Sequence, residues 1–537
     1  MSKPLNQSTA LVIDDFPSMR TMIMGFLKSM GLTRLSNAGT AKDALDLLAQ
    51  QKFDIVICDY NLGHGQNGQQ ILEAARHKGY IGYATIWVMV TAEKTMDMFM
   101  GAAETKPDDY LLKPVTEALL ESRLHKLIEK KQALEPIERA VRARDYLKAL
   151  SHCNTMLQNP SGTSQDVQRI KSELLMEMGD FQNAKSFFEG LLAARSTAWA
   201  RTGLGKVQFM NKEYEAARDS FQAVLKENKM YLEAADWLAK SLDALGDHQQ
   251  AQKVLSDAMA LSPNAVARQQ RLADSALKNG DLELAQSAYE KAIKLGEHSV
   301  HKNAGAYAGL AKALTARDEP EAALKVLGNS RTAFKDDAAA MLQTAVAESL
   351  AYRELGEAQK AAAALSEAET IAAAQPELAD SNTAMDMAAL MLQQGDKEKA
   401  MALLASVVKN NHENAGVLQQ VQGVFATAGM QEEGAALIKQ AAQEVVSINN
   451  QGVKLANEGK FEEGIALLRQ AVGAMPNNDL MLTNLCGMMI GLMNRTGKDA
   501  EMVTEARALL DKVGRINPAN KKYTLYLNLL GKMANAE

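Results

Sequence analysis

Residues 53–59 read FDIVICD, an apolar and largely β-branched run that ends in Asp59. A run of this kind is typical of a strand that is buried on both faces of a parallel sheet. Open α/β sheets carry their chemistry at the carboxyl ends of the strands. We therefore expect a functional site around Asp59.

Two further segments place charged groups at the same edge of the expected sheet. Residues 10–13 (ALVI) run into Asp14 and Asp15, and residues 110–112 (YLL) run into Lys113. Three carboxylates and one ammonium at neighbouring strand ends suit a hard divalent cation and a phosphoryl group. An Asp-Asp pair alone is more often a solvated turn or a helix cap, but these residues occur together and in order, which favours a site.

Residues 9 to about 128 alternate between strand and helix patterns, which predicts a parallel sheet with right-handed crossovers. The fold class that we expect is a doubly wound α/β domain with a five-stranded parallel sheet, followed by an all-α solenoid. The expected strands are 10–14, 32–38, 54–59, 86–91 and 110–112. The expected helices are 17–30, 41–50, 68–77, 95–104 and 116–131.

Composition restricts the setting. A chain of 537 residues is too long for one core, so two or more domains are expected. The sequence has neither an apolar run of transmembrane length nor a signal peptide, and its three scattered cysteines suit reduced thiols. A net charge of −6 with mixed signs argues against a nucleic-acid surface. We expect a cytoplasmic protein that binds neither nucleic acid nor membrane.

The first segment resembles the receiver domain of bacterial two-component response regulators. The resemblance covers the whole segment in the family's order, and it is carried by the motifs VIDDFPSMR at 12–20, ICDYNL at 57–62, MVTAE at 89–93 and YLLKP at 110–114.

The resemblance implies a role for each charged residue. Asp59 is the phosphoacceptor, a carboxylate nucleophile that attacks a phosphohistidine. Asp14, Asp15, Asp59 and the backbone carbonyl of Asn61 are the expected ligands of Mg²⁺, and Lys113 is expected to pair with a phosphoryl oxygen. A cis peptide bond is expected before Pro114.

The resemblance also implies a switch. Thr91 is expected to hydrogen-bond the phosphoryl group and move toward it, after which Tyr110 rotates inward. Asn61 and Glu93 match the pair found in chemotaxis-type receivers, which implies a transient phosphoryl mark. The loop at 63–68 is about one residue longer than usual and lacks the family's proline at Gly63.

After Pro136 the sequence reads as helices only, with an internal repeat. Buried-type alanines recur at Ala184, Ala217, Ala251 and Ala285, in steps of 33, 34 and 34 residues, and the motif before them is often Gly-Asp. The pattern resembles the tetratricopeptide repeat, with about ten copies and a capping helix after Pro518. Steps of 38 and 39 residues between 285 and 400 indicate longer helices or loops there.

Such a stack implies a superhelix whose concave groove binds a protein or a peptide. His298 and His301 could in principle hold a metal, but a polar turn between repeats is the better interpretation. Methionines are interpreted as core filler. The domains are predicted as a receiver at 1–130 and a repeat array at 131–537, closely coupled because no flexible linker separates them.

The sequence therefore predicts a response regulator that accepts a phosphoryl group on Asp59 and changes what its repeat array binds. Its expected partners are a sensor histidine kinase or phosphotransfer protein and an unidentified ligand of the groove. It is not expected to be an enzyme beyond chemistry on its own aspartate. Two alternatives stay open: a phosphate sink or relay, and a constitutive scaffold whose receiver controls only homodimer formation.

Overall fold

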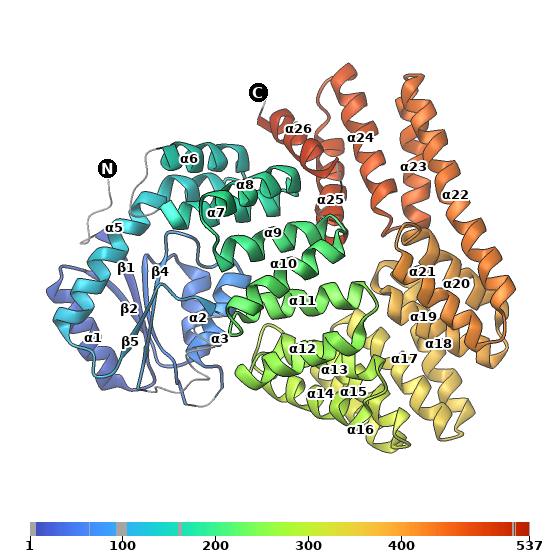
Figure 1. The fold of residues 1–537 in the computed structure, drawn as a ribbon, viewed down its shortest axis with the longest axis horizontal. Helices are drawn as coiled ribbons and strands as arrows, with labels where there is room; N and C mark the ends of the chain where they lie inside the picture. The colour runs from blue at the N-terminus through green and yellow to red at the C-terminus, as the bar shows by residue number, and fades with distance from the viewer. Residues whose placement is uncertain are drawn as a thin grey trace.

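The computed structural model describes residues 7–63, 65–92, 105–158, 164–517, 520 and 522–535. The chain begins with a five-stranded parallel sheet in the order β2-β1-β3-β4-β5 (Figure 1). Its strands are β1 (Thr9–Ile13), β2 (Arg34–Ala38), β3 (Ile55–Asp59), β4 (Ile86–Thr91) and β5 (Asp109–Leu112). The sheet thus confirms the doubly wound α/β fold that the sequence predicts.

Helices cover both faces of the sheet. They are α1 (Pro17–Ser29), α2 (Ala41–Gln50), α3 (Gly68–His77) and α5 (Glu117–Arg142). One apolar core lies between the sheet and α1 with α5, and includes Ile57 and Val88. The other lies between the sheet and α2 with α3, and includes Val56 and Trp87. The helix expected at 95–104 lies outside the described residues.

Strand register brings the expected site residues to one edge. Ile13 pairs with Cys58 across β1 and β3, so the residues that follow them, Asp14 and Asp59, are neighbours. Thr91 pairs with Leu112 across β4 and β5, which brings Lys113 to the same edge. The β1–β3 crevice is where the chain changes direction along the sheet, the usual ligand position in this fold class.

Helix α5 is longer than the sequence predicted. We expected a helix over 116–131, but α5 continues without interruption to Arg142, with Pro136 inside it. Proline removes one helical hydrogen bond and disfavours helix geometry before it. Packing outweighs this cost, because Leu134, Ile137 and Ala140 are buried in the first helical core of the array. One helix therefore spans the expected domain boundary.

Antiparallel helices follow one another through the rest of the chain (Figure 1). The first are α6 (Tyr146–Gln158), α7 (Ser164–Glu177), α8 (Phe181–Ala194), α9 (Ala198–Met210), α10 (Tyr214–Glu227), α11 (Leu232–Ala244), α12 (His248–Leu261), α13 (Val266–Lys278), α14 (Leu282–Gly296), α15 (Ala304–Ala316) and α16 (Pro320–Ala333). Then come α17 (Ala338–Glu354), α18 (Ala358–Ala374), η2 (Pro376–Leu378), α19 (Ser381–Gln394), α20 (Lys397–Asn410), α21 (Ala415–Thr427), α22 (Gln431–Asn457), α23 (Phe461–Ala474), α24 (Asp479–Thr496), α25 (Ala500–Ile516) and α26 (Tyr523–Asn535).

The Gly-Asp dipeptides form the turns inside these helix pairs. Gly246 has a left-handed φ of 82°, which ends α11, and the Asp247 side chain accepts a hydrogen bond from the Gln250 backbone amide at the start of α12. Gly280 and Asp281 repeat the arrangement between α13 and α14. The repeated dipeptide is therefore a helix stop followed by a helix cap.

The recurrent small residue lets the paired helices approach closely. Ala217, Ala251 and Ala285 are fully buried. At Gly434, where glycine replaces the alanine, a methyl group would stand 2.6 Å from the ring of Phe425. The larger neighbour explains the smaller residue at that repeat.

The longer steps in the repeat have a direct cause. Helices α17 and α18 are 17 residues each, whereas α11 and α12 have 13 and 14. The expectation of lengthened helices between 285 and 400 is confirmed. Buried methionines such as Met481 and Met489 fill the C-terminal core, as expected.

The array bends back toward its own beginning. Figure 1 shows α25 and α26 close to α8. Burial, Asp511 and Glu177 at the end of α7 together raise the pKa of Tyr523 at the start of α26, so the two ends of the array are electrostatic neighbours. Pro518 lies outside the described residues.

The close approach of α14 and α15 generates a prediction about stability. A methyl group at Gly309 would lie 2.3 Å from the ring of the buried Tyr289. We expect Gly309→Ala to lower the free energy of unfolding by about 1–3 kcal/mol, because the overpacked helices must separate. Urea denaturation followed by circular dichroism measures it.

The matched control is Gly328→Ala in α16, where nothing lies within 4 Å of the added methyl group. There we expect a gain of up to about 1 kcal/mol from helix propensity. Equal effects of the two substitutions would contradict the packing of α14 against α15.

Candidate functional site

Lys113 joins two of the strand-end carboxylates. Its ammonium nitrogen lies 2.8 Å from Asp59 Oδ2 and 3.0 Å from Asp14 Oδ2. Asp14 is 1% exposed and Asp59 is 6% exposed, so both carboxylates are removed from bulk water. The peptide bond between Lys113 and Pro114 is cis, as the sequence predicted. The structure thus brings together three of the residues that the sequence singled out.

Burial and charge act on these groups in opposite directions. Burial raises the pKa of Asp59 above its ordinary value, and Lys113 only partly offsets this. Burial alone would lower the pKa of Lys113, but its hydrogen bonds to Asp59 and Asp14 raise it overall. The lysine therefore stays charged, while the Asp59 carboxylate is poorly solvated and has Lys113 as its only cationic partner among the residues that are described.

The acidic residues have the composition and spacing of a metal site. Among the described residues, oxygen atoms of Asp14, Asp15 and Asp59 all lie within 4.8 Å of one another. Asp15 Oδ1 is buried, and it has no hydrogen-bond partner in the part of the chain that the structure describes. A hard cation such as Mg²⁺ prefers oxygen ligands and would satisfy this atom. The residues present therefore fit the cation that the sequence predicted.

Two residues that our sequence analysis did not assign to the site hold the acidic pair in place. The Arg20 guanidinium donates hydrogen bonds to the backbone carbonyls of Asp14 (2.6 Å) and Asp15 (3.2 Å). The Phe16 backbone amide donates to Asp14 Oδ1 at 2.9 Å. Arg20 stands one helical turn after Pro17, on the helix that directly follows the acidic pair. This position in the sequence could have indicated its role.

Gly68 is a second residue that sequence reasoning missed. A methyl group at this position would stand 2.2 Å from the backbone carbonyl oxygen of Asp59. The Gly68 amide also donates a hydrogen bond to the Tyr60 carbonyl at 2.8 Å. The start of α3 is thus drawn against the end of β3, which leaves no room for a side chain at position 68.

The residues of the expected switch lie nearby. Thr91 ends β4 and is 1% exposed, and its carbonyl accepts a hydrogen bond from the Lys113 amide at 2.7 Å. Tyr110 is half-buried and packs on the core that contains Trp87 and Met89. The Asn61 backbone donates a hydrogen bond to Asp59. Glu93 and His64 lie outside the described residues.

A groove runs along the array at the first helices of successive pairs. A cavity of about 780 Å³ is lined by residues that include Gln270 of α13, Lys312 of α15, Gln343 of α17 and Asp386 of α19. Lys312 and Asp386 form an ion pair between α15 and α19. His298 and His301 lie in the turn after α14, which fits the polar turn that we expected.

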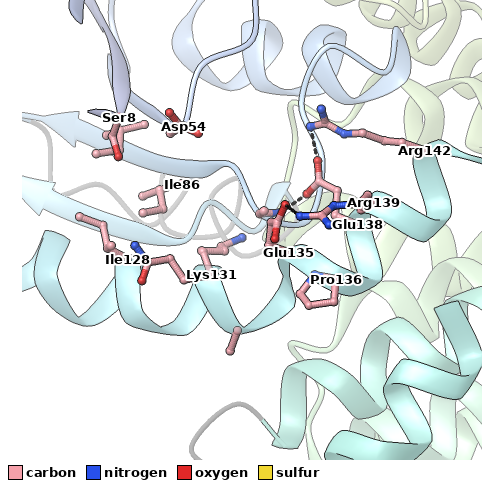
Figure 2. A pocket seen from close by; sticks show the side chains of 14 residues that line it. Ser8, Asp54, Ile86, Ile128, Lys131, Glu135, Pro136, Glu138, Arg139 and Arg142 are labelled. Atoms are coloured by element: carbon pink, nitrogen blue, oxygen red, sulfur yellow. Dashed lines mark hydrogen bonds and ion pairs between the residues drawn. The ribbon is translucent and has the colours of Figure 1, made fainter. Parts of the chain in front are cut away.

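A second cavity lies at the opposite end of the sheet from Asp59. It has a volume of about 700 Å³ and is bounded by the amino ends of the strands and by α5 around Pro136. Figure 2 shows Glu138 beside Arg142 and Glu135 beside Arg139 at its rim, each pair joined by an interaction. The residues that line this cavity come from the place where the sheet domain and the array meet.

Family models match two parts of the chain. The model described as a response regulator receiver domain matches residues 10–125. The model described as a tetratricopeptide repeat matches residues 171–231 and 271–338. Among the described residues, the helices are all too short or too polar to cross a membrane.

Curated relatives match the first part. Chemotaxis protein CheY of Pseudomonas aeruginosa is 32% identical over 120 residues, which cover 22% of this chain and 95% of that protein. Chemotaxis protein CheY-3 of Vibrio cholerae is 30% identical over 120 residues, which cover 22% of this chain and 91% of that protein.

Solved structures match parts of the chain at low sequence identity. The crystal structure of MamA protein has a TM-score of 0.30 at 17% identity and covers 34% of this chain and 94% of that chain. Chemotaxis protein CheY4 of Vibrio cholerae has a TM-score of 0.21 at 23% identity and covers 22% of this chain and 98% of that chain. On the sequence matches and the architecture together, this chain belongs to the response regulator receiver family of two-component signalling proteins, with tetratricopeptide repeats following its receiver domain.

Proposed function

We propose that this chain accepts a phosphoryl group on Asp59 from a phosphohistidine of a sensor kinase or phosphotransfer protein, and that its repeat array converts this event into a change in protein binding. The observation that carries the proposal is the Lys113 ammonium within 3.0 Å of both Asp14 and Asp59 at the end of a switch-point crevice. We divide the chain into a receiver at 1–130 and an array of about ten repeats at 131–537.

The chemical step needs an ionised and poorly solvated carboxylate. An Asp59 carboxylate oxygen attacks the phosphorus atom, the new O–P bond forms, and the P–N bond to the histidine ring breaks. The ring nitrogen keeps the electron pair of that bond and takes up a proton. Asp59 is 6% exposed, so its oxygen is weakly hydrated and ready to react.

Lys113 and the acidic pair would together offset the negative charge of the phosphoryl oxygens, Lys113 directly and the acidic pair through a bound cation. Lys113 lies 2.8 Å from Asp59 and is placed to pair with an oxygen of the incoming phosphoryl group. Asp14, Asp15, Asp59 and the carbonyl of Asn61 would hold Mg²⁺. When bound, this cation neutralises phosphoryl oxygens.

The output follows from Thr91 and Tyr110. Thr91 ends the buried strand β4, and we expect its side chain to hydrogen-bond the phosphoryl group. Tyr110 is half-buried beside Met89, one strand away, so a shift at Thr91 would reach it. The groove along α13–α19 is the surface that we assign to the bound partner.

The phosphoacceptor is tested by Asp59→Asn. We expect it to lose all labelling by radioactive acetyl phosphate, because an amide is not a nucleophile for this step. Asp46→Asn, an exposed position on α2, is the matched control and should label like the unmodified protein. Unchanged labelling of Asp59→Asn would contradict the assignment.

The same variant should keep its fold. Burial raises the pKa of Asp59 in the folded state, so folding favours the neutral side chain. The charge therefore costs stability, and the cost grows as the pH rises from the ordinary pKa of aspartate to the raised one. Asparagine carries no charge. We therefore expect the thermal midpoint of Asp59→Asn at neutral pH not to fall, as measured by circular dichroism.

The cation site is tested by melting curves with and without Mg²⁺. At about a hundred times its dissociation constant, Mg²⁺ should raise the free energy of unfolding by about 2.7 kcal/mol. Asp15→Asn should lose most of this effect, because Asp15 brings an otherwise unpartnered oxygen to the site. Asp46→Asn should keep it. A magnesium effect of the same size in Asp15→Asn would rule out this ligand.

A further inference from the structure

The sheet domain touches the array on two separate sides. On the first side the contact is continuous and apolar. Helix α5 runs from one part into the other, and Tyr83, from the loop between α3 and β4, packs on the core formed by α5, α6 and α7. The Tyr83 hydroxyl also hydrogen-bonds Glu173 of α7. This side has the character of a shared core.

Polar contacts reinforce the first side. The Lys131 ammonium lies 2.7 Å from both the Tyr83 carbonyl and Asp108 Oδ1. The buried Glu138 carboxylate accepts a hydrogen bond from the Ala84 amide and pairs with Arg142, as Figure 2 shows for the ion pair. These groups fix the 82–85 loop to α5. We take this side as the fixed part of the joint.

The second side consists of polar contacts at some distance from α5. The Lys106 ammonium lies 3.3 Å from Glu233 Oε2 on α11. The Gln66 side chain donates a hydrogen bond of 2.5 Å to the carbonyl of His298, in the turn after α14. The array residues involved therefore lie well beyond the first helix pair.

Both residues of the sheet domain on this second side are joined to the Asp59 site by a described element of the fold. Gln66 is in the connection from Asp59 to α3, and Lys106 stands shortly before β5, whose carboxyl end leads to Lys113. Arg76 of α3 donates hydrogen bonds to the carbonyls of Thr105 and Lys106, which links the two segments to each other. The start of α3 and the strand β5 therefore connect the site to the two contacts.

Glu233, which receives the Lys106 contact, belongs to the row of first helices, whereas His298 lies in the turn that follows the second helix α14. Glu173, Lys206 and Glu233 lie on α7, α9 and α11, and the same row continues into α13, α15, α17 and α19, which line the groove. Figure 1 shows the sheet domain lying beside α9 and α11. The beginning of the concave surface is thus covered by the chain's own sheet domain.

We propose that the Lys106–Glu233 and Gln66–His298 contacts form an intramolecular latch, and that phosphorylation of Asp59 opens it and uncovers the concave surface of α9 and α11. The inference rests on the proposed function, because it assumes that Asp59 is the residue modified. It adds the regulation: the receiver itself is the ligand of this surface in the unmodified state.

The charges at the latch suit a contact that opens easily. Lys106 is 54% exposed and Glu233 is 33% exposed, so water can replace the ion pair. Glu233 also pairs with Lys206 of α9, and Lys206 and Lys106 together lower its pKa although burial acts to raise it. When Lys106 leaves, Lys206 remains, and no carboxylate is left buried without a partner.

A zero-length carbodiimide cross-link on the full chain tests the latch. The reagent joins an ammonium to a carboxylate in contact, so the unmodified protein should give a linked peptide pair containing Lys106 and Glu233. With Mg²⁺ and beryllofluoride, a phosphoryl mimic, we expect the yield to fall about fivefold or more. Mass spectrometry of the digest measures it.

Each sample contains its own control. Lys185 on α8 and Glu213 before α10 lie 2.9 Å apart within the array, with exposures of 28% and 39%. Their cross-link should form equally with and without beryllofluoride. In Asp59→Asn, the Lys106–Glu233 cross-link should not respond to beryllofluoride.

A charge exchange provides a test that does not depend on the phosphoryl site. Lys106→Glu alone should lose the cross-link and open the latch. Adding Glu233→Lys should restore a link between the same two positions, because the cluster with Lys206 again holds two cations and one anion. A double variant that stays unlinked would contradict the contact.

The outcomes separate the latch from the proposed function. If beryllofluoride raises the thermal midpoint and the Lys106–Glu233 yield stays constant, the site is functional and the latch is wrong. If beryllofluoride changes neither the midpoint nor the yield, the proposed function and the latch both fail. Absence of the Lys106–Glu233 link in the unmodified protein, with the Lys185–Glu213 link present, also overturns the latch.

Discussion

One ammonium group at the edge of the sheet organises the site. Lys113 lies within 3.0 Å of both Asp14 and Asp59, and without it two buried carboxylates would repel each other. Its position depends on β5 pairing with β4 and on the cis peptide bond before Pro114. A phosphoryl group on Asp59 would compete for this same ammonium, so the interaction that holds the two carboxylates together is also the one that a modification must rearrange.

The second constraint is the continuity of α5. Because this helix belongs to the first core of the sheet domain at Leu120 and Leu124 and to the first core of the array at Leu134 and Ile137, the two parts cannot move as independent bodies. Motion must instead be a change of angle about this joint. A small rotation about this joint produces its largest displacement far from α5, where Lys106 and Gln66 contact the array.

Much of this arrangement could be predicted from residues in sequence. The apolar run at 53–59 predicted a buried parallel strand, and the acidic pair that begins at Asp14 predicted the edge of the sheet that carries the site. Both predictions follow from local pattern and strand order. The repeated Gly-Asp dipeptides predicted the helix pairs, because a helix stop and a helix cap are also local signals. The course of α5 through Pro136 could not be predicted, because the apolar contacts of Leu134 and Ile137 that sustain it come from helices later in the chain. Contacts such as Lys106 with Glu233, 127 residues apart, leave no local signal.

Phosphorylation of Asp59 is expected to change the contacts between the sheet domain and the array. Hydrogen–deuterium exchange on the full chain, with and without Mg²⁺ and beryllofluoride, tests it most directly. We predict faster exchange in the turn after α14 and at the start of α11, together with slower exchange at the ends of β1 and β3. Changes confined to the sheet domain, with the array unaffected, would contradict the account.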